Sequence, residues 1–260
     1  MPSIRNIPKA NALTPISHQS DTLQAPTRLL WLRDQLQAQE LPAELFMYRR
    51  NGKNHFNLYC HLKSNIGGRS RPILVTAHWD TVNAQSDNCL DNTASLQNLL
   101  ELGGKLKSRS AELMRDVILA WTDAEETQST YLCGAVEAAL AYQPELLLDL
   151  DLTAGGTHIL SNTHGKVAYD GVDNPPRETQ MPGNNAVLVW NLKNSGLLKS
   201  LEGAACLTLV DDADLKQLQE RAFCDRWSHC HRETDSFDRW LRPEEMNRFT
   251  DWLVDLILAY

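Results

Sequence analysis

Residues 71–92 read RPILVTAHWDTVNAQSDNCLDN, and this stretch decides the fold. Its apolar, partly β-branched run Ile73–Ala77 predicts a short buried strand. His78 follows that strand directly, and open α/β sheets bind their ligands beyond the carboxyl ends of the strands. Asp91 opens the next helical pattern, TASLQNLLELGGKL, in which Gly103 and Gly104 are expected to weaken the end of the helix. The sequence therefore predicts a carboxylate at a helix N-terminus, one loop away from a histidine.

Two further stretches repeat this order of an apolar strand followed by acids. Residues 115–126 read RDVILAWTDAEE and end in Glu125 and Glu126. Residues 145–154 read ELLLDLDLTA and carry two aspartates at the end of the apolar run. Because the carboxyl ends of parallel strands meet at one edge of a sheet, the three stretches predict a shared site.

Each group also has a plain structural interpretation. His78 and Asp80 could form a hydrogen-bonded pair without further function, and Asp91 could be an N-cap residue. The functional interpretation rests on three strands ending in the same way.

The order strand, helix, strand, helix, strand is typical of crossover units, so the fold class is α/β. We expect a three-layer sandwich, with a mixed, mostly parallel sheet covered by helices on both faces. Asn51-Gly52 predicts a hairpin whose loop is slightly longer than two residues. His55 and His61 of this hairpin are assigned to the surface. Helices are expected at 25–40, 93–106, 130–142, 196–201, 213–222 and 242–260, and strands at 45–49, 56–62, 73–77, 115–121, 145–151, 186–190 and 204–210, with a hairpin and long loop over 155–186.

Length and composition predict one large domain. The chain has 260 residues, of which 42% are hydrophobic, and this suits a single α/β core. Residues 1–24 are polar and without periodicity, so they are expected to form a flexible arm before a catalytic domain at 25–260.

The charge and the cysteines narrow the function classes. The formal net charge of −8 and the lack of a basic cluster argue against nucleic acid and membrane surfaces as partners. No signal peptide or membrane span is recognisable, so a cytoplasmic location is expected. The six cysteines have no CxxC spacing and are interpreted as reduced thiols. Nothing in the sequence predicts the oligomeric state.

Histidines and carboxylates that converge on one sheet edge match the nitrogen and oxygen ligands of zinc. Two zinc ions need a bridging carboxylate, and Asp91 is the natural candidate. Glu125 and Glu126 are adjacent and cannot point the same way, so one can bind metal while its neighbour handles protons.

Taken together, the motifs AHWDTV, DNTAS, WTDAEE, LDLT and HRETDSFD resemble the co-catalytic zinc exopeptidases of the bacterial leucyl aminopeptidase family. The glutaminyl cyclases belong to the same superfamily. The resemblance runs from about Ala25 to the C-terminus. Two departures, the absence of glycine after DNTAS and the late Gly134 after the paired glutamates, bear on substrate preference more than on metal binding.

The resemblance implies a role for each residue. His78 resembles a ligand of one zinc ion, oriented by the carboxylate of Asp80, and Asp91 resembles the bridging ligand. Glu126 resembles a ligand of the other ion, and Glu125 resembles the general base.

Two ligand positions have alternatives. Asp151 is preferred to Asp149 as the strand-end ligand, because DLT resembles related peptidase motifs and Asp149 is expected to face away. His231 is preferred to His229, because His231 lies four residues before Asp235 as in the H-x-x-x-D-[ST] pattern of the family. His229 would point to the same side if the loop were extended.

The resemblance implies a cytosolic zinc aminopeptidase or related amidohydrolase with two zinc ions. Its expected substrate is a small peptide or an acylated amino acid, attacked by water after Glu125 accepts a proton. Glutaminyl cyclase chemistry with one zinc ion is the alternative in the transferase class. The third possibility is a non-catalytic binding module on the same fold.

Overall fold

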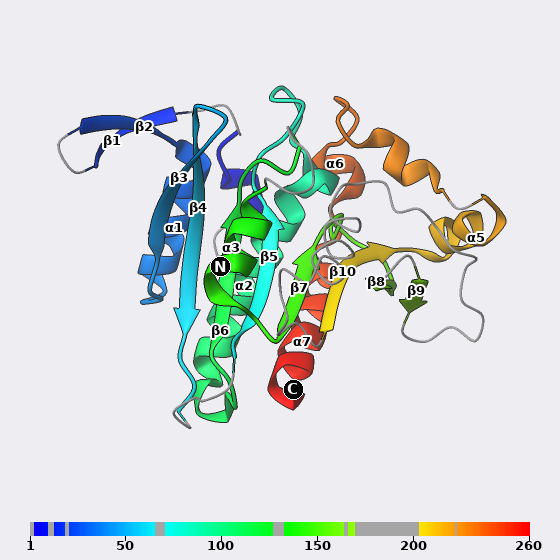
Figure 1. Cartoon of the computed structure of the whole chain (residues 1–260). Helices are drawn as coiled ribbons and strands as arrows, with labels where there is room; N and C mark the ends of the chain where they lie inside the picture. The colour runs from blue at the N-terminus through cyan, green and yellow to red at the C-terminus, as the bar shows by residue number, and fades with distance from the viewer. Residues whose placement is uncertain are drawn as a thin grey trace.

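A mixed β-sheet runs through the centre of the molecule. The computed structural model describes residues 3–9, 13–18, 21–65, 71–126, 133–163, 166–169, 203–221 and 223–260. Within these ranges, eight strands form the sheet in the order β3-β4-β6-β5-β7-β10-β8-β9 (Figure 1). Their bounds are β3 (Glu44–Arg50), β4 (Lys53–Leu62), β5 (Ile73–His78), β6 (Val117–Thr122), β7 (Leu146–Leu150), β8 (His158–Thr163), β9 (Lys166–Tyr169) and β10 (Gly203–Val210).

The four central strands, β6, β5, β7 and β10, are parallel to one another. The flanking pairs β3–β4, β4–β6, β10–β8 and β8–β9 are antiparallel. The predicted α/β class and mixed sheet are confirmed, but the mostly parallel character is confined to the centre. There it brings the carboxyl ends of β6, β5 and β7 side by side.

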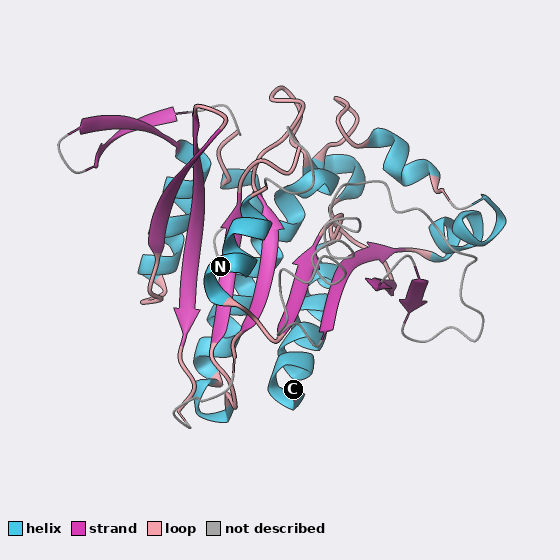
Figure 2. Ribbon diagram, in the orientation of Figure 1, coloured by secondary structure: helices cyan, strands magenta, loops and turns pink. Residues whose placement is uncertain are grey.

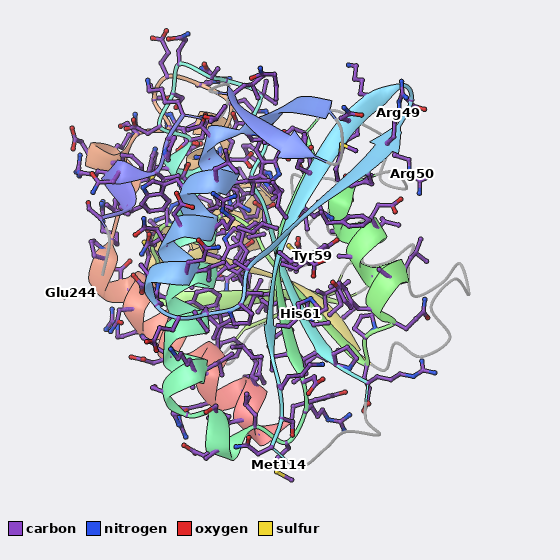
Figure 3. The ribbon with its side chains drawn as sticks, turned by 90° about the vertical axis from the view of Figure 1, so that its left-hand side faces the viewer. Arg49, Arg50, Tyr59, His61, Met114 and Glu244 are labelled. Carbon is purple, nitrogen blue, oxygen red and sulfur yellow. The ribbon has the colours of Figure 1, made fainter. Side chains whose placement is uncertain are left out.

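Helices cover both faces of the sheet, as predicted for a three-layer sandwich (Figure 2). Seen along the sheet in Figure 3, α1 (Thr27–Ala38), α2 (Ala94–Ser108) and α7 (Pro243–Ala259) lie on one side and α3 (Gly134–Tyr142) on the other. Successive residues of a strand point to opposite faces. Ile73 and Val75 of β5 therefore pack in the apolar cluster that includes residues of α1, α2 and α7, whereas Leu74 packs against α3. Two shorter helices, α5 (Asp212–Arg221) and α6 (Phe237–Trp240), precede α7 in the chain.

The glycine pair Gly103-Gly104, which was expected to weaken the end of α2, lies inside the helix. The helix continues to Ser108. A Cβ atom at Gly103 would lie 3.1 Å from a methyl carbon of Leu119 and 3.3 Å from one of Leu41. Glycine at this position thus permits close packing of α2 against the sheet.

The N-terminal residues contact the domain. A short 3-10 helix, η1 (Ile4–Asn6), is followed by the two-stranded hairpin of β1 (Leu13–His18) and β2 (Asp21–Pro26). Ile4 and Ile7 are buried in a cluster with Leu90 and Phe237. The division at residue 24 into an arm and a catalytic domain stays a prediction.

The expected loop at Asn51-Gly52 is a tight turn, because Arg50 pairs directly with Lys53. All six cysteines lie in the described part of the chain and are free, as predicted. The strand expected at 186–190 and the helix expected at 196–201 lie outside the described residues. Among the described residues, no helix is long and apolar enough to span a membrane.

Leu99 of α2 is fully buried between the helix and the sheet, so Leu99→Ala should leave a cavity in the main core. We expect the free energy of unfolding to fall by about 2–5 kcal/mol. Leu13 is 57% exposed, and Leu13→Ala makes the same chemical change with an expected effect within about 0.5 kcal/mol. Urea unfolding of both variants measures the difference. Equal losses in the two variants would contradict the packing described here.

Candidate metal centre

Three neighbouring strand ends supply the acidic and imidazole groups of the site. β5 ends at His78, and β7 ends one residue before Asp151. β6 ends at Thr122, and the turn that follows carries Glu125 and Glu126. Because β6, β5 and β7 are adjacent and parallel, these side chains meet at one edge of the sheet.

Asp91 lies at the middle of the group. It belongs to the irregular turn η2 (Cys89–Thr93), directly before α2, and its peptide bond to Asn92 is cis. Its Oδ1 lies 3.1 Å from Nε2 of His78, which is also 3.6 Å from Oδ1 of Asp151. Its Oδ2 lies 2.9 Å from Nε2 of His231, which is also 3.1 Å from Oε2 of Glu126. Each oxygen of Asp91 therefore faces one imidazole, and each imidazole faces one further carboxylate.

These separations fit a metal centre. Two metal–ligand bonds of about 2.0–2.1 Å at a tetrahedral angle separate their ligand atoms by about 3.3 Å. One ligand atom from each of His78, Asp91 and Glu126 lies within 4.8 Å of the others. In addition, Oε1 of Glu126 and Oδ1 of Asp151 are buried and accept no hydrogen bond. Buried carboxylate oxygens without donors are what a bound cation would satisfy.

Burial shapes the electrostatics of the group. Burial raises the pKa of Glu125 to about 9 and also raises the pKa of Glu126 and Asp151. For Asp91, burial acts in the same direction, but hydrogen bonds from His231 and His78 hold its pKa well below the usual value. Hydrogen bonds to Asp91 and Glu126 raise the pKa of His231 to about 10. The cluster thus favours bound positive charge, whether as protons or as a divalent cation.

The carboxylate of Asp80 contacts more than the sequence indicated. His78 Nδ1 lies 3.1 Å from the main-chain carbonyl oxygen of Asp80 and 3.5 Å from its Oδ1. The two carboxylate oxygens accept the main-chain N–H groups of Glu125, at 3.2 Å, and Glu126, at 3.0 Å. A hydrogen held on Nδ1 would leave the electron pair of Nε2 free to bind a metal ion. Asp80 therefore orients both His78 and the turn that carries the paired glutamates.

The structure distinguishes the two members of each pair of alternative ligand residues. Asp151 lies beside His78, whereas Asp149 lies within β7 and accepts a hydrogen bond from the hydroxyl of Thr76. His231 contacts Asp91, whereas the ring of His229 is engaged by Thr234, Trp240 and Arg239. The preferred residues are the ones in the group, and their role as ligands remains a prediction.

Asp235 links the His231 loop to the main chain around Asp91. Its Oδ1 accepts the N–H of Leu90 at 2.6 Å, and its Oδ2 accepts the N–H of Asp91 at 3.2 Å. The hydroxyl of Ser86 donates to its main-chain carbonyl at 2.7 Å. The H-x-x-x-D spacing flagged this aspartate, but only the fold shows that it supports the main chain of Asp91.

His55 and His61 are partly buried, so their assignment to the surface is wrong. His55 Nδ1 lies 3.3 Å from Oδ2 of Asp123, at the start of the glutamate turn. His61 Nε2 lies 3.0 Å from the hydroxyl of Tyr142, on the face covered by α3.

Gly134 packs so closely on the main chain of Asp123 that a Cβ would lie 2.6 Å from its nitrogen. The late glycine therefore supports the glutamate turn from the next element.

His231 marks the open side of the group, because 46% of its side chain is exposed whereas His78 is almost fully buried. The sequence predicts that the loops 127–134, 155–186 and 211–230 line the substrate pocket. Of these, residues 127–132, 164–165, 170–186 and 222 lie outside the described residues. His158, at the start of β8, contacts Asp212 at 2.6 Å and is not part of the group, and His164 lies outside the described residues.

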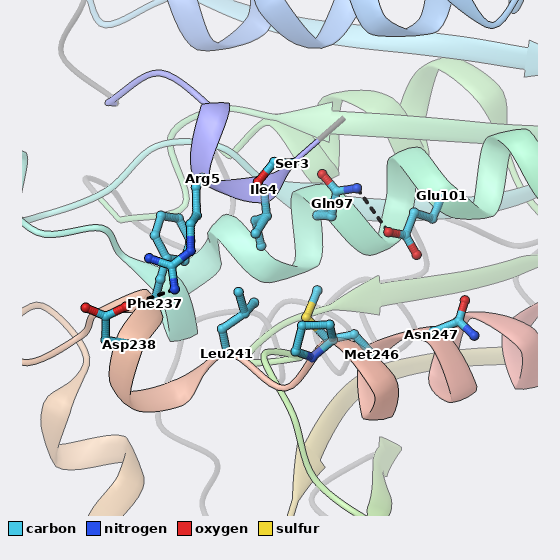
Figure 4. A pocket seen from close by; sticks show the side chains of 11 residues that line it. Ser3, Ile4, Arg5, Gln97, Glu101, Phe237, Asp238, Leu241, Met246 and Asn247 are labelled. Carbon is cyan, nitrogen blue, oxygen red and sulfur yellow. Dashed lines mark hydrogen bonds and ion pairs between the residues drawn. The ribbon is translucent and has the colours of Figure 1, made fainter. Parts of the chain in front are cut away.

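A cavity of about 540 Å³ lies elsewhere, where η1 meets α2, α6 and α7 (Figure 4). Ile4, Arg5, Phe237 and Met246 are among its lining residues. None of the predicted site residues lines it.

Comparisons with known proteins concern the family and the fold of the chain. Residues 57–170 match the sequence model of the family described as Peptidase family M28. The curated proteins searched gave no match. Among solved structures, glutaminyl cyclase from Porphyromonas gingivalis is similar with a TM-score of 0.64 at 15% identity, covering 98% of this chain and 93% of that chain.

Two peptidases are similar to the same degree. A Zn-dependent exopeptidase from Parabacteroides distasonis has a TM-score of 0.61 at 12% identity, covering 88% of both chains. The LapA aminopeptidase of Legionella pneumophila has a TM-score of 0.60 at 15% identity, covering 89% of this chain and 63% of that chain. Likeness at such identities establishes the fold. With the family match, it confirms the resemblance to the superfamily of zinc exopeptidases and glutaminyl cyclases.

The hydrogen bond to Asp123 raises the pKa of His55 above 6.5. Protonated His55 therefore adds stability that is complete below pH 6.5 and is lost as the pH rises through the folded-state pKa. We expect the free energy of unfolding of wild type to exceed that of His55→Gln by up to about 1 kcal/mol below pH 6.5. This difference should shrink as the pH rises above 6.5. Urea unfolding across the pH range measures this difference.

His61→Gln is the matched control. Burial lowers the pKa of His61, so the difference between wild type and His61→Gln should grow as the pH rises through 6.5. The same slope in both variants would contradict the assignment of the His55–Asp123 contact.

Proposed function

We propose that the chain is a zinc-dependent hydrolase of peptide or amide bonds, either an aminopeptidase that acts on small peptides or a related amidohydrolase that acts on acylated amino acids. The observation that carries the proposal is the position of Asp91, whose two carboxylate oxygens face different imidazoles. One zinc ion would be held by His78, Asp151 and Asp91, and the other by Glu126, His231 and Asp91. A bridging carboxylate with the remaining ligands divided between two ions is the pattern of a co-catalytic centre.

Zinc bound here would polarise the scissile carbonyl and make water acidic enough to be deprotonated near neutral pH. Glu125 is placed to accept that proton. Its carboxyl is buried, and the charges of His78, Asp91 and Asp151 act on it. Zinc bound beside it would favour the ionised carboxylate, which is the form that accepts a proton. The same carboxyl then delivers the proton to the leaving amine, so that no covalent intermediate with the chain is required.

The remaining residues orient these groups. Asp80 holds the glutamate turn through two main-chain hydrogen bonds, so the carboxyl groups of Glu125 and Glu126 diverge from a common support. Glu126 contacts His231, whereas the strongest charge effect on Glu125 comes from His78. The division of labour between neighbouring glutamates follows from this turn.

Glutaminyl cyclase chemistry is the second candidate, favoured by one observation. The chain spans 93% of the Porphyromonas gingivalis glutaminyl cyclase but 63% of LapA. In that reaction the α-amine of an N-terminal glutamine attacks the side-chain amide and releases ammonia. Release of the amine from an aminoacyl arylamide, compared with release of ammonia from a glutaminyl peptide, distinguishes the two activities.

The metal content tests the two-ion centre. After chelation and titration with zinc, we expect two ions per wild-type chain, and weakened binding of both in Asp91→Ala, because that change removes a ligand from each ion. Asp34→Ala, an exposed position, should still bind two ions. Metal analysis of each protein at defined free zinc measures this.

One ion in wild type would favour cyclase chemistry. No bound zinc would refute the enzyme proposal and leave a binding module. Loss of a single ion in Asp91→Ala, with full affinity for the other, would contradict the bridging role.

Glu125→Gln tests the proton carrier. The variant should lose activity by about 10²- to 10⁴-fold in kcat, because its amide cannot accept the proton, while it keeps two zinc ions. Glu112→Gln makes the same change at an exposed position and should behave as wild type. Steady-state kinetics with an aminoacyl arylamide measures both. Wild-type kcat in Glu125→Gln would exclude this glutamate as the base.

A further inference from the structure

Arg28, in the first turn of α1, is a buried cation beneath the metal centre. It is 2% exposed. Among the described residues its guanidinium forms no ion pair, and its Nε has no hydrogen-bond partner. Burial lowers the pKa of Arg28 to about 10, against the opposing charge of Asp80, so the group is still charged at neutral pH.

The two terminal nitrogens of Arg28 contact the two segments that carry His78 and Asp91. Nη1 donates to the main-chain carbonyl of Trp79 at 2.8 Å, between His78 and Asp80. Nη2 donates to the hydroxyl of Thr93, two residues after Asp91. One planar guanidinium group thus joins Trp79 and Thr93, which lie 51 and 65 positions after Arg28 in the chain.

The hydroxyl of Thr93 extends this link. It donates in turn to the main-chain carbonyl of Asp87 at 2.8 Å, in the loop between β5 and η2. The exit from β5, the following loop and the start of α2 are therefore connected through Arg28 and Thr93. These segments determine the distance between the imidazole of His78 and the carboxylate of Asp91.

Packing alone does not require a charged group here. Removing a guanidinium from water costs several kcal/mol, and an apolar side chain of similar volume would fill the same space without that cost. Arginine differs in presenting several donors in a rigid plane and a permanent charge. The charge of Arg28 acts on the carboxylate of Asp80, which contacts His78 and accepts hydrogen bonds from the glutamate turn.

We infer that Arg28 is a positioning residue for the metal centre, which sets the separation of His78 and Asp91 through the Trp79 carbonyl and the Thr93 hydroxyl. The inference rests on the proposed zinc-dependent function. It predicts that the affinity for zinc, and not only the stability of the fold, depends on a residue that touches no ligand side chain.

The test compares Arg28→Met, which keeps length but removes the charge and every donor, with Arg28→Lys, which keeps the charge. Zinc affinity is measured by competition with a chromophoric chelator, and the Tm of the zinc-free protein is measured separately. We expect Arg28→Met to bind zinc at least about 10-fold more weakly, with kcat lowered more than KM is changed, and Arg28→Lys to be intermediate. Arg33→Met, on the same helix at a more exposed position, should retain wild-type zinc affinity.

A lower Tm of zinc-free Arg28→Met with wild-type zinc affinity would overturn the inference and leave a purely structural role. If Arg28→Met does not fold, the zinc affinities of Arg28→Lys and Thr93→Val test the inference instead. Wild-type zinc affinity in both variants would overturn the positioning role of Arg28. Failure of the wild-type chain to bind zinc is a different result, because it removes the proposed function itself.

Discussion

The structure depends on the burial of several carboxylates at one edge of a parallel sheet. Asp91, Glu125, Glu126 and Asp151 converge where β6, β5 and β7 end, and only two imidazoles lie among them. Mutual repulsion and desolvation both oppose such a group. Positive charge must compensate it, and the proposed zinc ions would supply that charge on either side of Asp91. The account of function follows from this single electrostatic constraint.

The scaffold holds the ligands mainly through main-chain contacts. The carboxylate of Asp80 accepts two N–H groups of the glutamate turn, and the carboxylate of Asp235 accepts two N–H groups of the turn around Asp91. Each aspartate thus fixes a loop that has no regular secondary structure. Arg28 adds a third link, from the opposite direction, to the main chain between His78 and Asp80. Irregular loops therefore acquire defined positions from buried polar groups.

Local pattern was enough to predict the central strands and which side chains meet at their carboxyl ends. His78 follows an apolar run of strand length, and the acids after β6 follow another, so their place at a sheet edge could be read from periodicity. Asn51-Gly52 predicted the antiparallel hairpin of β3 and β4. The antiparallel pairing of β4 with β6 and of β8 with β10 could not be predicted in this way, because these strands are not joined by a short turn.

Contacts distant in sequence were also beyond prediction. Asp235 lies 145 positions from Leu90, whose N–H it accepts, and Arg28 lies 51 positions from Trp79. Nothing near Arg28 in the sequence distinguishes it from an ordinary first-turn arginine. The choice between His229 and His231 likewise needed the conformation of the loop, in which His231 has a positive φ of 65°.

Anomalous diffraction at the zinc absorption edge, from crystals grown with zinc, tests the central claim most directly. The account predicts two peaks about 3.5–4 Å apart, one bounded by His78, Asp151 and Asp91 and the other by Glu126, His231 and Asp91. Peaks located away from Asp91, or no peak at this sheet edge, would contradict it.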